Sequence, residues 1–552
     1  REKAIQALEM VEDIVREVEL GGIYYGEVTR IMNFGAFVDL GDGQTGLVHI
    51  SEITDGYVKD VSEFLSDIPK KTYDPFLLLN MEAGVDLLLS EIKLGTKICI
   101  YGDYDADGVT SICILSHVLS MLTDDLTYYI PSRFEEGYGL NKDAIKKIHE
   151  DGAGLLLTVD CGSVSYEEVE FAKQLGMKVI VTDHHSIDDI KADCILINPK
   201  QKECTYPFRE LAGCGVAFKM AQALLIRSGL PRSIVNDVLD LAAVGTVGDV
   251  VSLTDENRTI VKYGLNKINA GSRLSLNKLK KAISLPWITS ENIAFGIAPH
   301  INAAGRMASA KEAAELFLTD NELTMDEKVE KLVGYNSLRK KKQEDAYNRC
   351  MEKLTGDEKF IMLHMEDIHE GIGGIVAGKI KETACRPTVI VTPSGEGYLK
   401  GTGRSLDNID IYELLKRHED LFERFGGHKS ACGFLMKEEN LEVLKCALDK
   451  DMEVMMEDDP HLFDKDIDWD MELTPEEVTV ALAAELEKME PVGQGNPKPM
   501  FIIRDISIVQ TRFMGADSTH ARFSAVSETG GRCECVLFKR AQELKNLLHI
   551  LY

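Results

Sequence analysis

The sequence predicts an α/β protein: a doubly wound domain on a parallel sheet, a second α/β domain, and partial β-barrels at both ends. Three observations support this fold class. Between residues 97 and 197, short apolar runs alternate with helical patterns, as they do in parallel sheets. A similar alternation returns after residue 358, and both ends of the chain are rich in β-branched residues and glycine turns. The 552 residues also exceed what one core organises, so two to four domains are expected.

Residues 1–60 form the first predicted segment. "GGIYYGEVTRIMNFGAFVDLGDGQTGLVHISEI" alternates short β-rich runs with glycine turns, which predicts a small antiparallel barrel of the OB type. About three of the five strands of such a barrel precede residue 60. We therefore expect a partial barrel here.

The first α/β domain is expected over residues 61–310. Its predicted strands lie at 97–101, 127–130, 155–159, 177–182 and 194–197, with helices near 109–122, 141–150 and 165–174. The rest of this domain is mainly helical and leads to a linking helix at 311–357. That helix carries "RKKK" at 339–342, a run that usually marks a solvated face.

The second α/β domain is expected over residues 358–450, with strands in "KFIMLHM" and "RPTVIVT". Residues 451–552 begin with a strongly acidic connection, which we expect at the surface. From "PVGQGNPKPMFIIRDISIVQTRF" onward the chain is β-rich, and a second partial OB-type barrel is predicted.

Composition limits the function classes. Hydrophobic residues make up 44% and charged residues 28% of the chain, and no apolar run approaches the ~20 residues that span a bilayer. We expect a soluble protein without a membrane partner. The twelve scattered cysteines indicate reduced thiols and a cytoplasmic location. The net charge of −29 argues weakly against a nucleic-acid partner, although it does not exclude a local basic channel.

Acids and histidines follow three predicted strands and one helical stretch. They are Asp103, Asp105, Asp107, Asp160, Asp183, His184, His185 and Asp249. Because the carboxyl ends of neighbouring parallel strands share one edge of the sheet, these side chains should converge. Any single Asp could instead be a helix N-cap or a turn residue. As a set they would repel one another without cations, and their oxygen-rich chemistry suits two Mg²⁺ or Mn²⁺ ions.

Four of these stretches resemble the motifs of the DHH phosphoesterase superfamily: "DYDADG", "TVDCG", "DHH" and "GTVGDVV". Further stretches resemble the RecJ family of exonucleases, in the same order along the chain. They are "IPSRFEEGYGL", "INAAGRM", "GIGGIVAGKI", "GTGRS", "FGGHKSACGF" and "PVGQGNPKPMF". The resemblance covers about residues 62–552. It makes the two α/β units a DHH domain and a DHH-associated domain.

The resemblance implies a metal-dependent exonuclease that degrades single-stranded DNA 5′ to 3′ in DNA repair and recombination. The catalytic residues implied by the resemblance are Asp105, Asp107, Asp160, His184, His185 and Asp249. The implied ligands of two Mn²⁺ or Mg²⁺ ions are Asp103, Asp105, Asp107, Asp160, His184 and Asp249, with Asp160 as the bridge. The residues implied to hold phosphates are Arg133, Arg306, Thr402, Arg404, Gly426, Gly427 and His428. His300 departs from the family pattern, where Arg is common, so one phosphate contact is expected to be weaker.

Residues 1–60 resemble a different family. They are similar to the junction of the KH domain and the S-one RNA-binding barrel in polynucleotide phosphorylase. We therefore expect either a natural fusion or a chimeric gene, truncated at both ends, with RNA as an additional partner of this segment. The alternatives for the whole chain are a nanoRNase or cyclic-dinucleotide phosphodiesterase of the DHH superfamily, or a non-catalytic nucleic-acid-binding protein. A monomer is expected.

Overall fold

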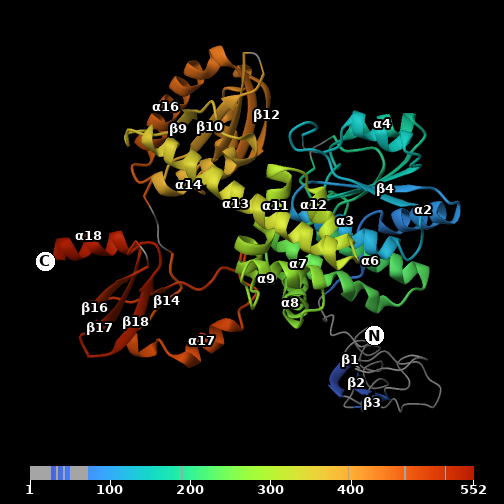
Figure 1. Ribbon diagram of the computed structural model, residues 1–552, viewed down its shortest axis with the longest axis horizontal. Helices are drawn as coiled ribbons and strands as arrows, with labels where there is room; N and C mark the ends of the chain where they lie inside the picture. Colours follow the sequence, from blue (N-terminus) through green and yellow to red (C-terminus); the bar gives the residue numbers. More distant parts are fainter. Residues whose placement is uncertain are drawn as a thin grey trace, which may run out of the picture.

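The molecule has two α/β lobes joined by a long helix, with a smaller β-rich part at each end (Figure 1). The computed structural model describes residues 27–32, 35–41, 44–49 and 72–551, except 138, 188–189, 396, 465–467 and 516. The predicted fold class is confirmed.

A small antiparallel sheet lies near the N-terminus. It consists of β1 (Glu27–Met32), β2 (Gly35–Gly41) and β3 (Gln44–His49), in the order β1-β2-β3. These are the three barrel strands that the sequence predicts. The other residues of the predicted segment 1–60 lie outside the described residues.

The first lobe is built on a five-stranded sheet in which every pairing is parallel. Its strands are β4 (Ile98–Gly102), β5 (Leu126–Tyr129), β6 (Leu155–Val159), β7 (Lys178–Thr182) and β8 (Ile195–Ile197). The first and last residues of each strand agree with the predicted ranges to within about one residue. The order β5-β4-β6-β7-β8 places the topological switch point between β4 and β6, where ligands bind in such sheets.

Helices cover both faces of this sheet. They are α2 (Met81–Lys93), α3 (Ala106–Leu119), α4 (Lys142–Glu150) and α5 (Tyr166–Gln174). Along β4, Ile98 and Ile100 join the core with α2 and α3, whereas Cys99 and Tyr101 join the core with α4 and α5. This is the two-residue alternation of a strand buried on both faces. Helix α3 begins earlier than the predicted 109, because Asp105 caps it.

A helical region completes the first lobe and packs against α3. Its elements are α6 (Gly213–Ser228), η4 (Arg232–Val238), α7 (Leu239–Gly248), α8 (Asp255–Ala270), α9 (Leu274–Ala282), α10 (Ser290–Asn292), the π-helical turn η5 (Ile293–Ile297), α11 (Ala298–Met307) and α12 (Lys311–Leu318). Helix α13 (Glu322–Glu352) then leads to the second lobe. The predicted linking helix is thus two helices, since Asn321 caps the second one.

The second lobe contains a mixed sheet in the order β12-β13-β11-β10-β9. Its strands are β9 (Ile361–His364), β10 (Thr388–Pro393), β11 (Tyr398–Arg404), β12 (Phe422–His428) and β13 (Ala431–Lys437). Its helices are α14 (Gly373–Ala384), α15 (Ile411–Lys416) and α16 (Leu441–Asp458). Helix α16 includes the first residues of the predicted acidic connection.

The C-terminal part has two small sheets, β14-β15 and β16-β17-β18. Its elements are β14 (Met471–Glu472), α17 (Val480–Glu487), β15 (Phe501–Ile502), β16 (Ile506–Met514), β17 (His520–Ser527), β18 (Arg532–Leu537) and α18 (Ala541–Leu551). The twelve cysteines are all free thiols, as predicted. Within the described ranges, no helix is long and apolar enough to cross a membrane.

Candidate active site

The site begins where β4 runs into α3. Asp105 is the N-cap of α3, and its Oδ1 accepts hydrogen bonds from the amides of Asp107 (2.9 Å) and Gly108 (3.0 Å). A Cβ at Gly108 would lie 2.4 Å from the carbonyl oxygen of Asp103. Only glycine therefore allows this tight turn, which holds the three acids of "DYDADG" together. Asp105 is thus a helix N-cap, as one interpretation of the sequence allows, and its capping hydrogen bonds orient the carboxylate.

Asp107 is fully buried and is held by the N-terminus of α6. Its two carboxylate oxygens accept hydrogen bonds from the amides of Gly213 (2.7 Å) and Cys214 (2.8 Å). Amides at a helix N-terminus stabilise a negative charge, whereas burial raises the pKa of Asp107. A Cβ at Gly213 would lie 2.5 Å from Asp160 Oδ1, so glycine is required where these two acids meet.

Asp160 follows β6 and lies in a left-handed conformation, with φ of 59°. This conformation is unfavourable for a residue with a Cβ, and such strain is concentrated at functional sites. The Asp160 carboxyl is buried, and burial, followed by repulsion from Asp107 and Asp105, raises its pKa well above the usual range.

His184 lies among three of the acids. Its Nε2 is 3.1 Å from Asp160 Oδ1, 3.5 Å from Asp249 Oδ2 and 3.8 Å from Asp107 Oδ2. Neither ring nitrogen has a hydrogen-bond partner of suitable geometry among the described residues. Burial lowers the pKa of His184 to about 4, so the ring is neutral at pH 7 and can act as a metal ligand.

Asp183 organises the two histidines. It accepts hydrogen bonds from the amides of Ser163, His184 and His185, and lies 2.8 Å from His185 Nδ1. Burial would raise the pKa of Asp183, but the interaction with His185 holds it below its usual range. Burial also opposes protonation of His185, yet Asp183 raises the pKa of this ring. The sequence places Asp183 beside the histidines but does not reveal this positioning role.

Asp249 completes the group from the C-terminus of α7. Burial and repulsion by Asp107 and Asp105 raise its pKa to about 9. Burial, followed by repulsion from Asp105, likewise raises the pKa of Asp103 to about 8.

Three sets of ligand atoms lie within 4.8 Å of one another: Asp103, Asp105 and Asp160; Asp160, His184 and His185; and Asp107, His184 and Asp249. The structure thus brings the predicted acids and histidines together. Asp160 and His184 each belong to two sets. The buried Asp103 Oδ1, Asp160 Oδ1 and His184 ring nitrogens have no hydrogen-bond partners among the described residues. Oxygen donors with imidazole fit Mg²⁺ or Mn²⁺. Burial and then mutual repulsion raise the pKa values of Asp103, Asp160 and Asp249, and such cations would relieve that repulsion.

A cluster of arginines lies beside this crevice. Burial, followed by repulsion from the charges of Arg133, Arg339 and Arg404, lowers the pKa of Arg306 to about 10. The Arg133 guanidinium stacks 4.1 Å from the ring centroid of Tyr104, which lies within the acidic turn. Arg306 is therefore repelled by three other guanidiniums next to the converging acids, and an anion such as phosphate would stabilise this cluster.

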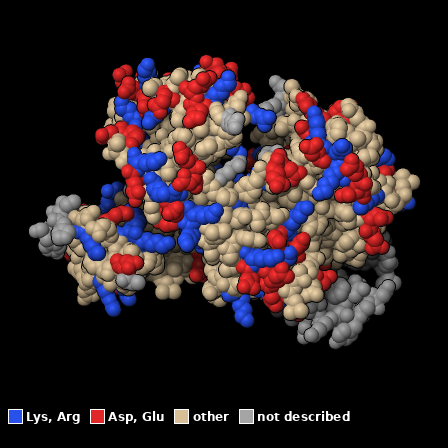
Figure 2. Space-filling view, turned by 45° about the horizontal axis from the view of Figure 1, so that its top comes forward, with Lys and Arg blue, Asp and Glu red and all other residues tan. Residues whose placement is uncertain are grey.

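One contact across the two lobes and close packing within the second lobe hold this cluster. Arg306 Nη1 donates to the carbonyl of Gly371 (2.8 Å). A Cβ at Gly374, in the first turn of α14, would lie 2.9 Å from Arg404 Nη2 and 3.0 Å from Thr402 Cγ2. Figure 2 shows the surface hollowed between the lobe of α16 and the lobe of α4, with basic side chains at the hollow. A local basic region thus exists despite the acidic chain.

The sequence pattern does not reveal the environment of Arg339. Its "RKKK" run predicts a solvated helix face, which is correct for the three exposed lysines. Arg339 is half-buried, and its Nε donates to Asn336 Oδ1 (3.0 Å). Asn336 Nδ2 lies 3.0 Å from Nε2 of the buried His300. His300 therefore supports Arg339 through Asn336, a contact between helices that the sequence does not reveal.

The predicted "GGH" residues lie on β12 at the edge of the second sheet. Gly427 has φ of 153°, and a Cβ there would lie 2.4 Å from the carbonyl oxygen of Ala431. Gly426 and His428 are exposed on the same strand. A glycine is required at position 427 by the neighbouring strand β13.

A metal-binding crevice at the switch point, followed by a helical linker and a second α/β lobe, defines a DHH phosphoesterase. The models of the DHH family, N-terminal domain, and of the DHHA1 domain match residues 97–246 and 357–453. The model of the RecJ OB domain matches residues 469–552, and the S1 RNA binding domain matches residues 17–71.

The chain belongs to the RecJ family. It is 35% identical over 480 residues to the single-stranded-DNA-specific exonuclease RecJ of Bacillus subtilis, covering 85% of this chain and 60% of that relative. It is 34% identical to RecJ of Escherichia coli, covering 77% of this chain and 78% of the relative. The crystal structure of Thermus thermophilus RecJ in complex with Mn²⁺ superimposes with a TM-score of 0.71 at 31% identity, over 83% of this chain and 68% of that one. The structure of the same protein in complex with Mg²⁺ superimposes with a TM-score of 0.67 at 31% identity, over 84% of this chain and 65% of that one.

Proposed function

We propose that the chain is a metal-dependent exonuclease that hydrolyses single-stranded DNA from the 5′ end, in DNA repair and recombination. One observation carries the proposal: buried acids with raised pKa values converge with His184 beside a cluster of arginines. The Bacillus subtilis and Escherichia coli relatives are named single-stranded-DNA-specific exonucleases. A cytoplasmic location and a monomeric state belong to the same proposal.

In this proposal Asp105, Asp107, Asp160, His184 and Asp249 would hold two Mn²⁺ or Mg²⁺ ions. Asp160 would contribute to both, since it is the acid that two of the three ligand sets share. Asp103 supports the same group as an additional ligand. When bound, two such ions polarise a phosphodiester and make water a better nucleophile.

The other residues position the substrate. Arg133, Arg306 and Arg404, with Thr402, hold phosphate near the 5′ end, because guanidinium binds two phosphate oxygens at once. Asp183 favours the protonated form of His185, which lets that ring donate a hydrogen bond to a phosphate oxygen. Gly426, Gly427 and His428 would contact the DNA strand farther from the crevice.

A substrate comparison tests this proposal against a nanoRNase or a cyclic-dinucleotide phosphodiesterase. With Mn²⁺, kcat/KM should be highest for single-stranded DNA and far lower for duplex DNA, dinucleotides and cyclic dinucleotides. A preference for dinucleotides would replace the proposal with the alternative. Binding of DNA without hydrolysis of any of these substrates would indicate a non-catalytic protein.

Replacing Arg404 by Ala should weaken binding of single-stranded DNA. Each lost phosphate contact should also reduce the log–log salt slope by about 0.7 to 1 unit. Hydrolysis of a small chromogenic phosphodiester should stay nearly unchanged, because that substrate does not extend to the arginine cluster. Fluorescence anisotropy at several salt concentrations measures the slope, with Arg417→Ala as the control because Arg417 is exposed on the same lobe. Equal losses on both substrates would place Arg404 in the metal site or the core instead.

The N-terminal segment supports a second, separate function in RNA binding. The S1 RNA binding domain model matches residues 17–71, which extends past the predicted boundary at residue 60. The acids of the crevice begin with Asp103 and all lie C-terminal to this segment. A chain that begins at Val61 should therefore keep its exonuclease rate, metal dependence and thermal midpoint while it loses affinity for RNA. Loss of cleavage or a lower midpoint would mean that the segment docks on the catalytic lobes.

A further inference from the structure

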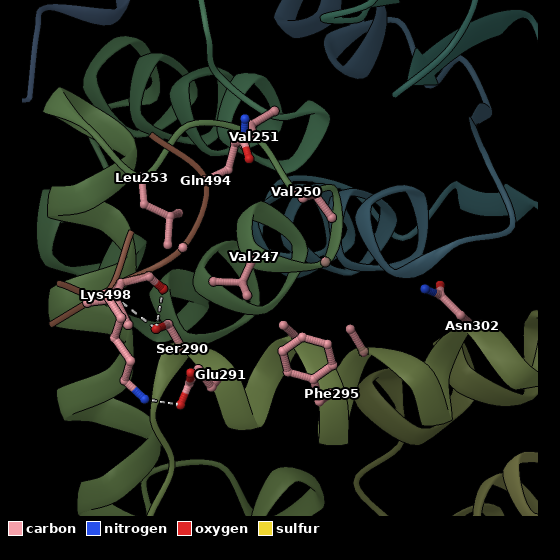
Figure 3. A pocket seen from close by; sticks show the side chains of 15 residues that line it. Val247, Val250, Val251, Leu253, Ser290, Glu291, Phe295, Asn302, Gln494 and Lys498 are labelled. Carbon is pink, nitrogen blue, oxygen red and sulfur yellow. Dashed lines mark hydrogen bonds and ion pairs between the residues drawn. The ribbon is translucent and has the colours of Figure 1, made fainter. Parts of the chain in front are cut away.

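An apolar pocket of about 400 Å³ lies beside the proposed metal centre. Its walls include Val247, Val250, Leu253, Phe295, Ala298 and Gln494. In Figure 3 the Phe295 ring rises from its helix toward Val247 and Val250, which come from the opposite side of the pocket. The volume lies in the range of small-molecule binding pockets.

Two apolar side chains at this pocket are exposed to solvent. Phe295 is 80% exposed and Val250 is 67% exposed. The backbone is irregular at both positions: Phe295 lies in the π-helical turn η5, and Val250 has φ of 63°. π-helical turns and β-branched residues at positive φ are uncommon and concentrate at functional sites. The fold thus holds two apolar side chains in water at some conformational cost, which points to a ligand.

One helix face connects this pocket to the proposed catalytic residues. Phe295, Ala298 and Asn302 all line the pocket, and Ala298, Asn302 and Arg306 lie four residues apart on α11, so these three share a face. Asn302 Oδ1 accepts a hydrogen bond from the amide of Ala106 (2.7 Å), between Asp105 and Asp107. With a rise of about 1.5 Å per residue, the helix extends ~16 Å from the arginine cluster, past the acids, to Phe295.

The opposite wall belongs to the helix that carries Asp249. A Cβ at Gly248 would lie 3.0 Å from Ala106 Cβ and 3.4 Å from Ala298 Cβ. The end of α7 therefore packs closely between α3 and α11. Val250 follows Asp249 directly, so the pocket opens immediately next to a proposed metal ligand.

The third wall is the "PVGQGNP" segment, which lies between α17 and β15 in the C-terminal part. Ser290 Oγ donates to the carbonyl of Val492 (2.6 Å), and the amide of Leu253 donates to the carbonyl of Gln494 (2.7 Å). Arg258 Nη1 donates to the carbonyl of Pro491 (3.0 Å). These bonds fix the segment against the first lobe, which gives this motif a role as a wall of the pocket.

We propose that the pocket binds one base of the DNA strand, stacked on Phe295, on the 3′ side of the cleaved phosphodiester. The inference rests on the proposed function. A strand with its 5′ phosphate at Arg306 and its cleaved bond at the acids would continue along the helix face to Phe295. An exposed aromatic ring beside apolar walls suits any base, because every base has a π-face. The pocket thus secures the strand without selecting its sequence.

The experiment uses single-stranded oligonucleotides that each lack one base, at successive positions from the 5′ end. For the full chain with Mn²⁺, removal of one particular base should lower kcat/KM by about 5- to 150-fold, the loss expected for one base–aromatic stack. For the Phe295→Ala variant, kcat/KM on the intact strand should be lower by the same factor, and removal of that base should cause no further decrease. The Phe295→Tyr variant should regain both the wild-type kcat/KM on the intact strand and its sensitivity to removal of that base.

Two controls separate stacking from folding. Leu323→Ala alters an apolar side chain that is also 80% exposed and should change nothing. The thermal midpoint of Phe295→Ala should match that of the wild type, and its hydrolysis of a chromogenic phosphodiester should be unaffected. If no position in the wild type is sensitive, or if Phe295→Ala keeps the full penalty, the inference is wrong although the exonuclease proposal stands. If the wild type does not degrade the intact strand, the proposed function fails and the inference fails with it.

Discussion

Replacing Asp160 by Asn should lower the rate of single-stranded DNA hydrolysis by about 10³-fold or more, a loss of ~4 kcal/mol in transition-state stabilisation, while the fold survives. Asp160 is the acid that belongs to two of the three ligand sets, and its Oδ1 is buried without a hydrogen-bond partner among the described residues. An amide keeps the shape of the side chain but removes the charge that would hold both cations. Single-turnover hydrolysis at saturating Mn²⁺ measures the effect.

A melting experiment distinguishes loss of metal from loss of folding. Without divalent metal, Asp160→Asn should melt at the same temperature as the wild type or higher, because the substitution removes repulsion from Asp107 and Asp105. With Mn²⁺, the wild type should gain stability and the variant should gain much less. Asp193→Asn is the matched control, since the Asp193 side chain is 96% exposed. Turnover of Asp160→Asn near that of the wild type would contradict the assignment.

The second large effect is a pH dependence of metal binding. The pKa of Asp103 is raised to about 8 and that of Asp249 to about 9, in both cases chiefly by burial and then by neighbouring carboxylates. A divalent cation must displace the protons that these groups hold near neutral pH. The affinity for Mg²⁺ should therefore rise by up to about tenfold per pH unit for each proton displaced. Titration calorimetry in buffers of different ionisation enthalpy counts those protons.

The same groups determine how stability depends on pH without metal. Their pKa values are raised above the unfolded value near 3.9, so their stabilising contribution is complete below about pH 4. It is lost as the pH rises through the folded values of about 8 and about 9. The thermal midpoint without metal should fall between pH 6 and pH 9, less steeply for Asp249→Asn. A Mg²⁺ affinity independent of pH, with no proton release, would contradict this prediction.

The parallel sheet and the convergence of the acids could be predicted because both depend on local patterns. Strands buried on both faces are short apolar runs, and a side chain after a parallel strand lies at a known edge of the sheet. This rule alone predicts that Asp103, Asp160 and His184 converge, and their ligand atoms do lie together. The roles given to Arg133, Arg306 and Arg404 came from resemblance, and the structure brings these three residues together.

Other features could not be predicted because they depend on contacts between distant segments. The amides of Gly213 and Cys214 reach Asp107 only after α6 packs against α3. The sequence pattern around Arg339 predicts a solvated helix face. Its place in the arginine cluster depends on packing against other helices, which the pattern does not show. Phe295 lies in the part of the domain that the sequence predicts to be mainly helical, and that pattern does not distinguish a π-helical turn from an α-helix.

Digestion of single-stranded DNA with a labelled 5′-terminal phosphate, compared with the same strand labelled at its 3′ end, tests the central claim most directly. With Mn²⁺, the account predicts that the 5′ label is released at once as a mononucleotide, while the 3′ label stays in progressively shorter fragments. EDTA should stop both reactions, added Mn²⁺ should restore them, and Asp160→Asn should leave both labels in intact strands. Release that persists in EDTA, or immediate release of the 3′ label, would contradict the account of a metal centre that degrades DNA from the 5′ end.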